Sequence, residues 1–194
     1  MARTLTPRGE ERRSQLMATA AELFAERGFH PTSVSDIVEA IGVGKGVFYW
    51  YFPSKEDLLD ELLRAAQHDL RRRQQLAIEP VADPIERIEL GIGASLQWFQ
   101  EHRQYFTLFR FAASNERFAP TLQQSHALAI ADTARHIQAA IAEGRCVERN
   151  PEMLAEAIVG VVEQLTQSQL MEREGSVDAV CDLAVAFCLR GLRG

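Results

Sequence analysis

The amino-acid sequence predicts an all-α protein of about nine helices, in which three N-terminal helices precede a larger helical domain. Apolar residues recur at intervals of three and four residues through most of the 194-residue chain, which is the period of an amphipathic helix. No segment shows the alternation of apolar and polar residues that marks a half-buried strand. Proline, glycine and helix-capping residues divide the chain into lengths typical of globular helices.

Three helices are expected in the first 55 residues. The Thr6-Pro7 pair predicts the start of the first, because a capping hydroxyl precedes a proline in the first helical position. Gly28 and Gly42 are expected to end the first two helices, and Pro53 the third. The three helices cover about residues 7–27, 31–41 and 45–51.

Six longer or more apolar helices follow. The segment 79–84, which contains two prolines, is the clearest break in the chain, and Gly144 and Gly175 separate the last three helices. The six helices begin at about Ser54, Ile85, His102, Pro120, Pro151 and Val177. We therefore expect two domains, residues 1–55 and residues 56–194.

The two expected domains differ in charge. Residues 1–55 carry seven Lys/Arg and six Asp/Glu, whereas residues 56–194 carry fourteen and twenty-one, and the whole chain has a net charge of −6. The first thirteen residues include Arg3, Arg8, Arg12 and Arg13. Any affinity for phosphate should therefore belong to the N-terminal end, and the acidic remainder should discourage indiscriminate binding of nucleic acid.

Several classes of protein are not favoured by the sequence. The polar first thirteen residues contain no apolar core of a signal peptide, and no apolar run approaches the roughly 20 residues that span a bilayer, so we expect a soluble cytoplasmic protein without a membrane partner. Cys146, Cys181 and Cys188 lack a CxxC spacing and are interpreted as free thiols. Neither metal-ligand spacing nor a catalytic constellation was found, so no metal, cofactor or enzyme activity is expected.

The segment 32–59 carries the functional signal. Its two short helices are joined by a turn at Gly42 and are too short to be stable alone. Packed together on the neighbouring helices, they have the arrangement of a helix-turn-helix, whose second helix enters the major groove of DNA. The apolar side chains expected to form its small core are Val34, Ile37, Val38, Ile41, Val43, Phe48 and Phe52.

The residues left on the outer surface of this segment are candidates for contact with DNA. Lys45 can donate to bases or phosphate, Val47 offers an apolar surface to a thymine methyl, and Tyr49 can donate to phosphate. The polar start of the second helix and Lys55 are expected to face phosphate. The candidate residues are Thr32, Ser33, Ser35, Lys45, Gly46, Val47, Tyr49, Trp50 and Lys55.

The string TSVSDIVEAIGVGKGVFYWYFPSKEDLL at 32–59 resembles the DNA-binding signature of the TetR family, and AELFAERGF at 21–29 resembles the first helix of that signature. The resemblance covers about residues 10–60. It implies a homodimer that binds a double-stranded DNA operator, with an inducer bound in the C-terminal domain. Ile41, Gly44 and Val47 replace the alanine, serine and threonine common in the family, so base recognition should depend more on Lys45 and on apolar contacts.

The last two helices are expected to form a dimer interface. Each is apolar over a wider face than one core contact requires, and a second subunit would cover the excess in a four-helix bundle about a two-fold axis. Packing of the last helix inside its own domain is the alternative. The candidate interface residues are Ile158, Val162, Leu165, Val180, Ala184 and Phe187.

An aromatic segment near residues 98–111 is a candidate ligand site. Large rings with a few polar groups can line an apolar cavity, although such a cluster can equally be ordinary core. The resemblance to the TetR family implies that this domain binds the inducer. The candidate residues are Trp98, Phe99, Tyr105, Phe106, Phe109, Arg110, Gln164 and Gln167.

The sequence thus leads to two functional hypotheses. The first is a homodimeric repressor that a small apolar or amphipathic ligand releases from a palindromic operator. The second is a DNA-binding regulator without a small-molecule inducer, controlled by its abundance or by a protein partner.

Overall fold

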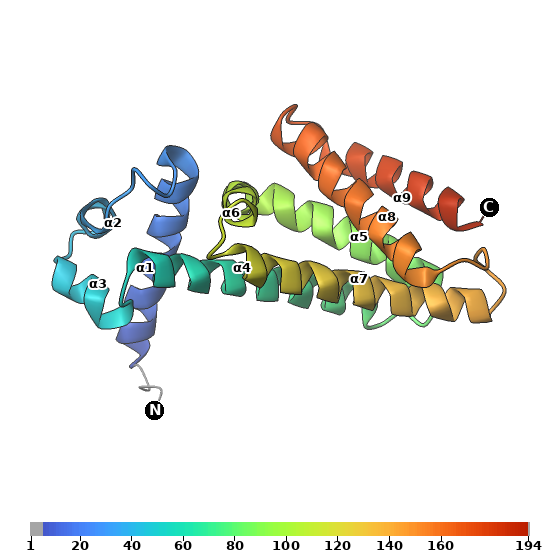
Figure 1. Cartoon of the computed structure of the whole chain (residues 1–194), viewed down its shortest axis with the longest axis horizontal. Helices are drawn as coiled ribbons and strands as arrows, with labels where there is room; N and C mark the ends of the chain where they lie inside the picture. Colours follow the sequence, from blue (N-terminus) through green and yellow to red (C-terminus); the bar gives the residue numbers. More distant parts are fainter. Residues whose placement is uncertain (1–5, 194) are drawn as a thin grey trace. The chain divides into compact units, whose positions relative to one another are not determined.

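The computed structural model describes residues 6–193, and this part of the chain forms nine α-helices and one π-helical segment with no β-strand (Figure 1). The expectation of an all-α fold is therefore confirmed. The elements are α1 (Pro7–Arg27), α2 (Val34–Ala40), α3 (Lys45–Tyr51), α4 (Lys55–Ile78), α5 (Pro84–Glu101), α6 (Arg103–Ala113), α7 (Ala119–Ala142), α8 (Pro151–Leu165), the π-helix η1 (Thr166–Met171) and α9 (Val177–Arg193).

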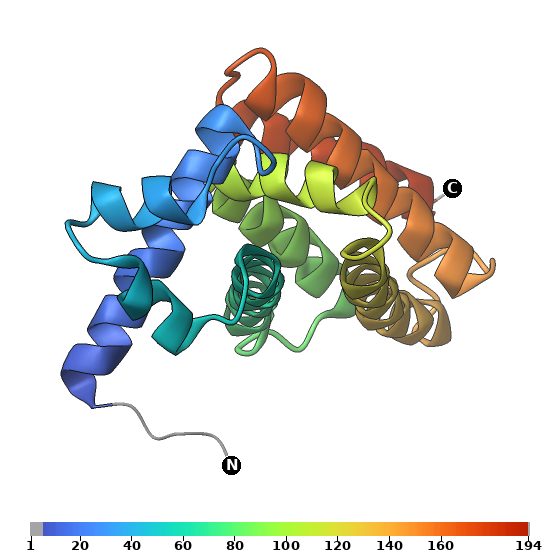
Figure 2. The same ribbon diagram turned by 60° about the vertical axis from the view of Figure 1, so that its left-hand side comes forward.

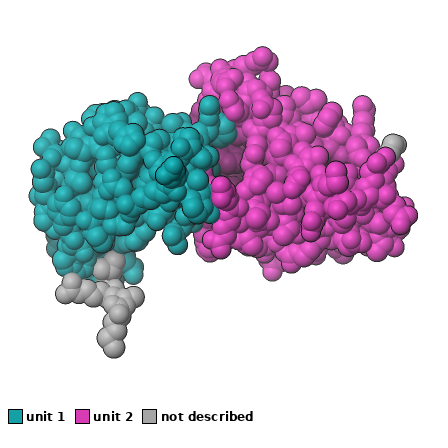
Figure 3. Space-filling view, in the orientation of Figure 1, with its two compact units in different colours: residues 1–66, 104–121 teal, residues 67–103, 122–194 magenta. Residues whose placement is uncertain are grey.

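The chain divides into two compact units (Figure 3). Unit 1 consists of residues 1–66 and 104–121, and unit 2 of residues 67–103 and 122–194. Helix α4 begins in unit 1 and ends in unit 2, and nearly all of α6 belongs to unit 1 with the three N-terminal helices. The functional domains expected at 1–55 and 56–194 remain a proposal, because compactness and function need not divide a chain at the same residue.

The ends of the first two helices follow from local sequence. The Thr6 hydroxyl accepts a hydrogen bond from the Gly9 amide at 3.3 Å and caps α1. Gly28 ends α1 with a φ of +89°, and Gly42 follows α2 with a φ of +67°. Both glycines adopt a backbone conformation that other residues rarely tolerate, so the expected helix stops at these positions are confirmed.

The three N-terminal helices of unit 1 (Figure 2) enclose a small aromatic core, which the burial of their side chains defines. Phe48 and Phe52 are fully buried with their ring centroids 5.7 Å apart, and Ile37 and Val38 of α2 are buried as well. The expected core is therefore confirmed for these four side chains. The other three expected members, Val34, Ile41 and Val43, are only partly buried.

Unit 2 is a helical bundle in which α9 packs against α5 and α8 lies beside α9 (Figures 1 and 2). One continuous apolar cluster joins these helices and the end of α7. Its largest buried members include Ile88, Leu96, Ile137, Ile158 and Leu192. Burial of this apolar surface is the main source of stability for the unit.

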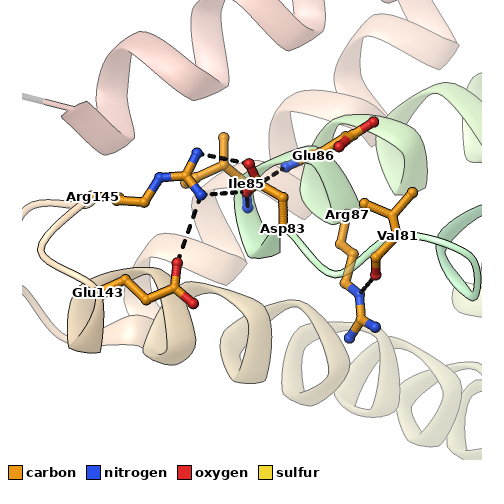
Figure 4. A network of polar contacts seen from close by, with 7 residues as sticks. All are labelled: Val81, Asp83, Ile85, Glu86, Arg87, Glu143 and Arg145. Carbon is orange, nitrogen blue, oxygen red and sulfur yellow. Dashed lines mark hydrogen bonds and ion pairs between the residues drawn. The ribbon is translucent and has the colours of Figure 1, made fainter.

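A polar network fixes the loop between α7 and α8 to the start of α5 (Figure 4). Asp83 caps α5 by accepting hydrogen bonds from the amides of Ile85 at 2.8 Å and Glu86 at 3.4 Å. Arg145 binds the same carboxylate at 2.7 Å and 2.8 Å, and this contact lowers the pKa of Asp83. Glu143 lies 3.6 Å from the Arg145 guanidinium.

Polar contacts also hold the second half of α4 within unit 2. The Trp98 indole N–H donates to the Asp69 carboxylate at 2.8 Å, and Arg71 pairs with Asp132 of α7 at 2.7 Å. Two further pairs, Arg73 with Glu101 and Gln74 with Ser95, join α4 to α5 at about the same distance. The end of α4 is therefore tied to both α5 and α7.

Helix α8 does not end at its last α-helical residue but continues as the π-helix η1. The Glu172 amide donates to the Gln167 carbonyl at 3.1 Å, a bond that spans five residues, as expected in a π-helix. Arg103 donates to the Met171 carbonyl at 3.2 Å, so the guanidinium caps the end of this segment. The sequence predicts only an α-helix here, so the π-helical turn is a correction to that prediction.

Within residues 6–193, no helix has both the length and the apolar character required to cross a bilayer. No group of three His, Cys, Asp or Glu side chains in residues 6–193 is arranged to hold a metal ion.

Candidate nucleic-acid interface

Helix α3 is anchored from one side. Phe48 and Phe52, one turn apart, point into the core of unit 1, and the Arg13 guanidinium lies 5.3 Å from the centroid of the Phe52 ring. Arg13 also forms an ion pair with Glu61 of α4. A helix of seven residues is unstable by itself, so these contacts hold α3 in place.

The other side of α3 is directed toward solvent. Lys45 and Gly46 are exposed, Val47 is partly exposed, and Tyr49 and Trp50 retain 55% and 52% of their accessible surface. Large aromatic side chains are rarely this exposed on a surface that contacts nothing. The five residues expected to contact DNA on this helix are therefore accessible to a partner molecule.

The start of α2 is closed by a reciprocal cap. The Ser33 hydroxyl accepts from the Asp36 amide at 3.2 Å, and the Ser33 amide donates to the Asp36 carboxylate at 2.7 Å. Hydrogen bonds from the Ser33 side chain and backbone lower the pKa of Asp36. Ser33 is exposed and Ser35 is partly exposed. The carboxylate of Asp36, however, lies at the helix end that was expected to bind phosphate.

Thr32 is directed into the protein. Its side chain is buried, and its hydroxyl lies 2.8 Å from the Gly28 carbonyl and 3.3 Å from the Leu23 carbonyl. The hydroxyl therefore donates its hydrogen bond to carbonyls at the C-terminal end of α1 and not to a phosphate. The Thr32 side chain is thus turned away from solvent, and the expected phosphate contact through backbone amides at the start of α2 stays a prediction.

Lys55 is also directed inward. Its ammonium donates to the carbonyls of Phe29 and Thr32, each at 2.7 Å, and lies 3.4 Å from the carbonyl of His30. Burial lowers the pKa of Lys55. The expectation that Lys55 points outward to a phosphate is therefore corrected, because its ammonium donates hydrogen bonds to carbonyls of the loop between α1 and α2.

An aromatic cluster in unit 1 was missed in the sequence. Phe29 packs against Phe24, Phe111 and Phe118, with ring centroids 5.1 Å, 5.2 Å and 5.8 Å away. Arg117 pairs with Asp57 at 3.1 Å, at the start of α4. The end of α6 and the turn after it are therefore packed onto the helix-turn-helix, a contact that spans about 80 residues of sequence and leaves no local signal.

The eight candidate ligand residues fall in different environments. Trp98 is fully buried and stacks on His102 with ring centroids 4.6 Å apart. Gln164 is exposed, and the Gln167 amide donates to Glu172 at 3.0 Å. Phe99, Tyr105, Phe106 and Phe109 are partly buried and Arg110 is exposed. The ligand site stays a prediction.

The expected dimer residues lie mostly on the wrong side of their helices. Ile158, Val162, Val180 and Ala184 are buried in the apolar core of unit 2, and Leu165 packs against that core. The prediction that the side chain faces a partner is therefore wrong for the four buried residues, and it stays a prediction for Leu165, which is partly exposed. Phe187 is the exception, since 63% of its surface is exposed.

A different face of α8 and α9 carries exposed apolar side chains. Met153 of α8 is 68% exposed, and Leu183 of α9, one turn before Phe187, is 55% exposed. Ala157 and Gly160 continue the exposed face of α8. These small side chains allow close approach of another helix, and the large ones offer apolar surface to it.

Comparison with known proteins identifies relatives of this chain. Residues 16–62 match the family described as bacterial regulatory proteins, tetR family. The HTH-type transcriptional repressor KstR2 of Mycobacterium tuberculosis is 35% identical over 99 residues, which is 51% of this chain and 50% of that repressor. The chain thus aligns with only about half the length of KstR2.

Two further similarities extend over most of the chain. The uncharacterized HTH-type transcriptional regulator YdgC of Bacillus subtilis is 30% identical over 172 residues, which cover 84% of both chains. The solved structure of the ketosteroid transcriptional regulator KstR2 of Mycobacterium tuberculosis has a TM-score of 0.76 and 26% identity, over 94% of this chain and 95% of that one.

Proposed function

This chain belongs to the TetR family of DNA-binding transcriptional regulators, and we propose that it is a homodimeric repressor that a small apolar or amphipathic ligand releases from a palindromic operator. A dimer would present two copies of α3 about one turn of DNA apart, roughly 34–36 Å, to two half-sites. A ligand that prefers a conformation with a different separation would weaken DNA binding by its differential affinity for that conformation.

One observation carries the DNA-binding part of the proposal. Helix α3 keeps Lys45, Tyr49 and Trp50 exposed while Phe48 and Phe52 anchor it from behind. A single helix turned outward from a helix-turn-helix matches the way such helices enter the major groove. Lys45 would donate to guanine or phosphate oxygens, and Tyr49 would donate its hydroxyl to a phosphate.

Lys45→Ala and Tyr49→Ala are expected to lose operator binding without loss of fold, because neither side chain is buried. The probe is a duplex selected from a random-sequence pool by the wild-type protein, and binding is measured by gel shift at moderate salt. Circular dichroism and size-exclusion chromatography report the fold. Arg135→Ala, which removes an exposed cation from α7 of unit 2, is the matched control and should bind normally. Normal binding by both α3 variants would overturn the proposed interface.

The dimer is supported by the exposed apolar face of α8 and α9. Met153, Leu183 and Phe187 are large apolar side chains that stay 68%, 55% and 63% exposed, and exposed apolar surface of this kind favours an interaction site. A second copy of the chain could cover it by placing its own α8 and α9 on the same face about a two-fold axis. The proposed interface therefore keeps Phe187 and replaces the four expected residues that are buried in the core of unit 2.

The ligand is the least constrained part of the proposal. The aromatic residues of α5 and α6 offer apolar surface, and KstR2 is called a ketosteroid regulator, which favours an apolar or amphipathic compound as the first class to test. A thermal-shift screen of such compounds should reveal one that stabilises the wild type and weakens its operator binding. Phe109→Ala should reduce both effects. The absence of any stabilising compound would favour control by abundance or by a protein partner.

A further inference from the structure

We propose that Lys55 acts on DNA binding from inside the protein, as a positioning residue that fastens the loop between α1 and α2, and does not bind a DNA phosphate. The inference rests on the proposed DNA interface at α2 and α3. It assigns a separate role to a cation that the sequence placed at that interface.

The ammonium of Lys55 has little capacity left for a phosphate. An ammonium has three N–H donors, and three carbonyls face this one, those of Phe29 and Thr32 at 2.7 Å and that of His30 at 3.4 Å. A phosphate contact would require at least one of the short bonds to break. Charge-assisted bonds of this length are among the stronger hydrogen bonds in proteins, so the exchange would be costly.

The ammonium of Lys55 also contacts an aromatic ring. The Nζ atom lies 4.3 Å from the centroid of Phe29, within the range of a cation–π contact. Phe29 is itself buried, with Phe24 and Phe111 against it. Movement of the ammonium outward would therefore give up the ring contact together with the carbonyls.

The bonded loop leads directly into α2. Residues 29–32 precede Ser33, the cap of α2, and α2 in turn packs against α3. Lys55 donates hydrogen bonds to the carbonyls of this loop, and the Thr32 hydroxyl donates to the carbonyl of Gly28. Loss of the Lys55 donors would leave two carbonyls without their partner, and the loop would have to rearrange to find others. That rearrangement would displace the start of α2.

A chemical footprint of the wild-type protein separates the two roles. Lys45 and Lys55 are the only lysines in the chain, so Lys45 is an internal control. Amine acetylation of the free protein, followed by peptide mass spectrometry, should modify Lys45 readily and Lys55 slowly. Addition of the selected duplex should protect Lys45 and leave the rate at Lys55 unchanged.

A variant provides the second measurement. Lys55→Met retains an aliphatic chain over Phe29 and removes the donors. We expect its operator affinity to fall about tenfold, with the same slope of log affinity against log salt as the wild type. Lys45→Ala should reduce the magnitude of that slope by about 0.9, the value for one lost phosphate contact. In the free Lys55→Met protein, amide hydrogen exchange of residues 29–36 should become faster.

The outcomes distinguish this inference from the proposed function. A Lys55 that labels quickly in the free protein and is protected by DNA, or a reduced salt slope in Lys55→Met, would overturn the positioning role. A Lys45 that DNA leaves unprotected would instead overturn the proposed interface. The footprint uses only the wild type, so it decides the matter even if Lys55→Met fails to fold.

Discussion

At the scale of single residues, Gly46 offers a test of how closely α3 approaches DNA. A Cβ built on Gly46 meets no other atom of the described chain within 4 Å, so alanine fits without strain. Alanine also favours a helix by up to about 1 kcal/mol over glycine. We expect Gly46→Ala to keep or raise thermal stability and to weaken operator binding, because the added methyl would occupy space needed by the duplex. Unchanged affinity in a gel shift would show that the backbone at this position stays away from DNA.

His136 links the stability of unit 2 to pH. Burial, together with the nearby Arg87 and Arg135, lowers the pKa of His136 below 6.5. The unfolded chain therefore binds more protons than the folded one just below that pH, so the contribution is present above 6.5 and is lost as pH falls toward the folded pKa. The urea midpoint should decline from about pH 7.5 to about pH 5. A His136→Gln variant should show a smaller decline, and an identical decline would exclude His136 as its source.

The two lysines show what a sequence can and cannot predict about a side chain. Lys45 was expected on the outer side of a short helix, and helical periodicity alone placed it there correctly. Lys55 was expected outside as well, but its carbonyl partners lie 23 to 26 residues away in a loop. The path of a loop is not encoded by periodicity, so neither the inward direction of Lys55 nor that of the Thr32 hydroxyl could be foreseen.

At the scale of elements, helix boundaries were predicted well because their causes are local. Gly28, Gly42 and Gly144 all adopt positive φ at the helix ends where they were expected. The helix expected to begin at Pro151 does so, and Asn150 before it caps α8 by accepting hydrogen bonds from the amides of Glu152 and Met153. Such signals act within a few residues and are visible in the sequence.

The orientation of a helix was harder to predict than its length. In α8, Ile158 faces the core while Met153 faces outward, although both are large and apolar. When a helix is apolar on two sides, its sequence does not indicate which side packs inside its own domain. Four of the six expected dimer residues therefore lie on the buried face, whereas Phe187 lies on the exposed one.

The turn after α6 should contribute to the stability of the helix-turn-helix unit. Phe118 is buried and its ring lies 5.8 Å from that of Phe29. Phe118→Ala should cost about 3–5 kcal/mol of unfolding free energy, the usual range for loss of a buried aromatic ring. Chemical denaturation measures this cost. Hydrogen exchange should show that the loosened segment includes residues 28–33, and loosening restricted to residues 114–121 would contradict the packing.

At the scale of the whole molecule, the proposed dimer rests on the outer face of α8 and α9. Phe187→Glu and Leu183→Glu each place a charge on an exposed apolar position, so they should leave the chain folded and make it monomeric. Sedimentation velocity measures the mass of the particle. DNA binding should weaken when the dimer is lost, because a monomer carries only one copy of α3. Leu76→Glu on α4, which is equally exposed, is the matched control and should stay dimeric. A dimer that survives both α9 substitutions would exclude this face.

The π-helix η1 has a consequence for comparisons among relatives. Its hydrogen bonds span five residues instead of four, so residues 166–171 depart from the α-helical repeat of α8. The chain leaves the helix at Glu172, so the change of phase is confined to this last turn. An alignment that continues α8 of a relative as an uninterrupted α-helix would therefore assign the side chains of residues 166–171 to the wrong face.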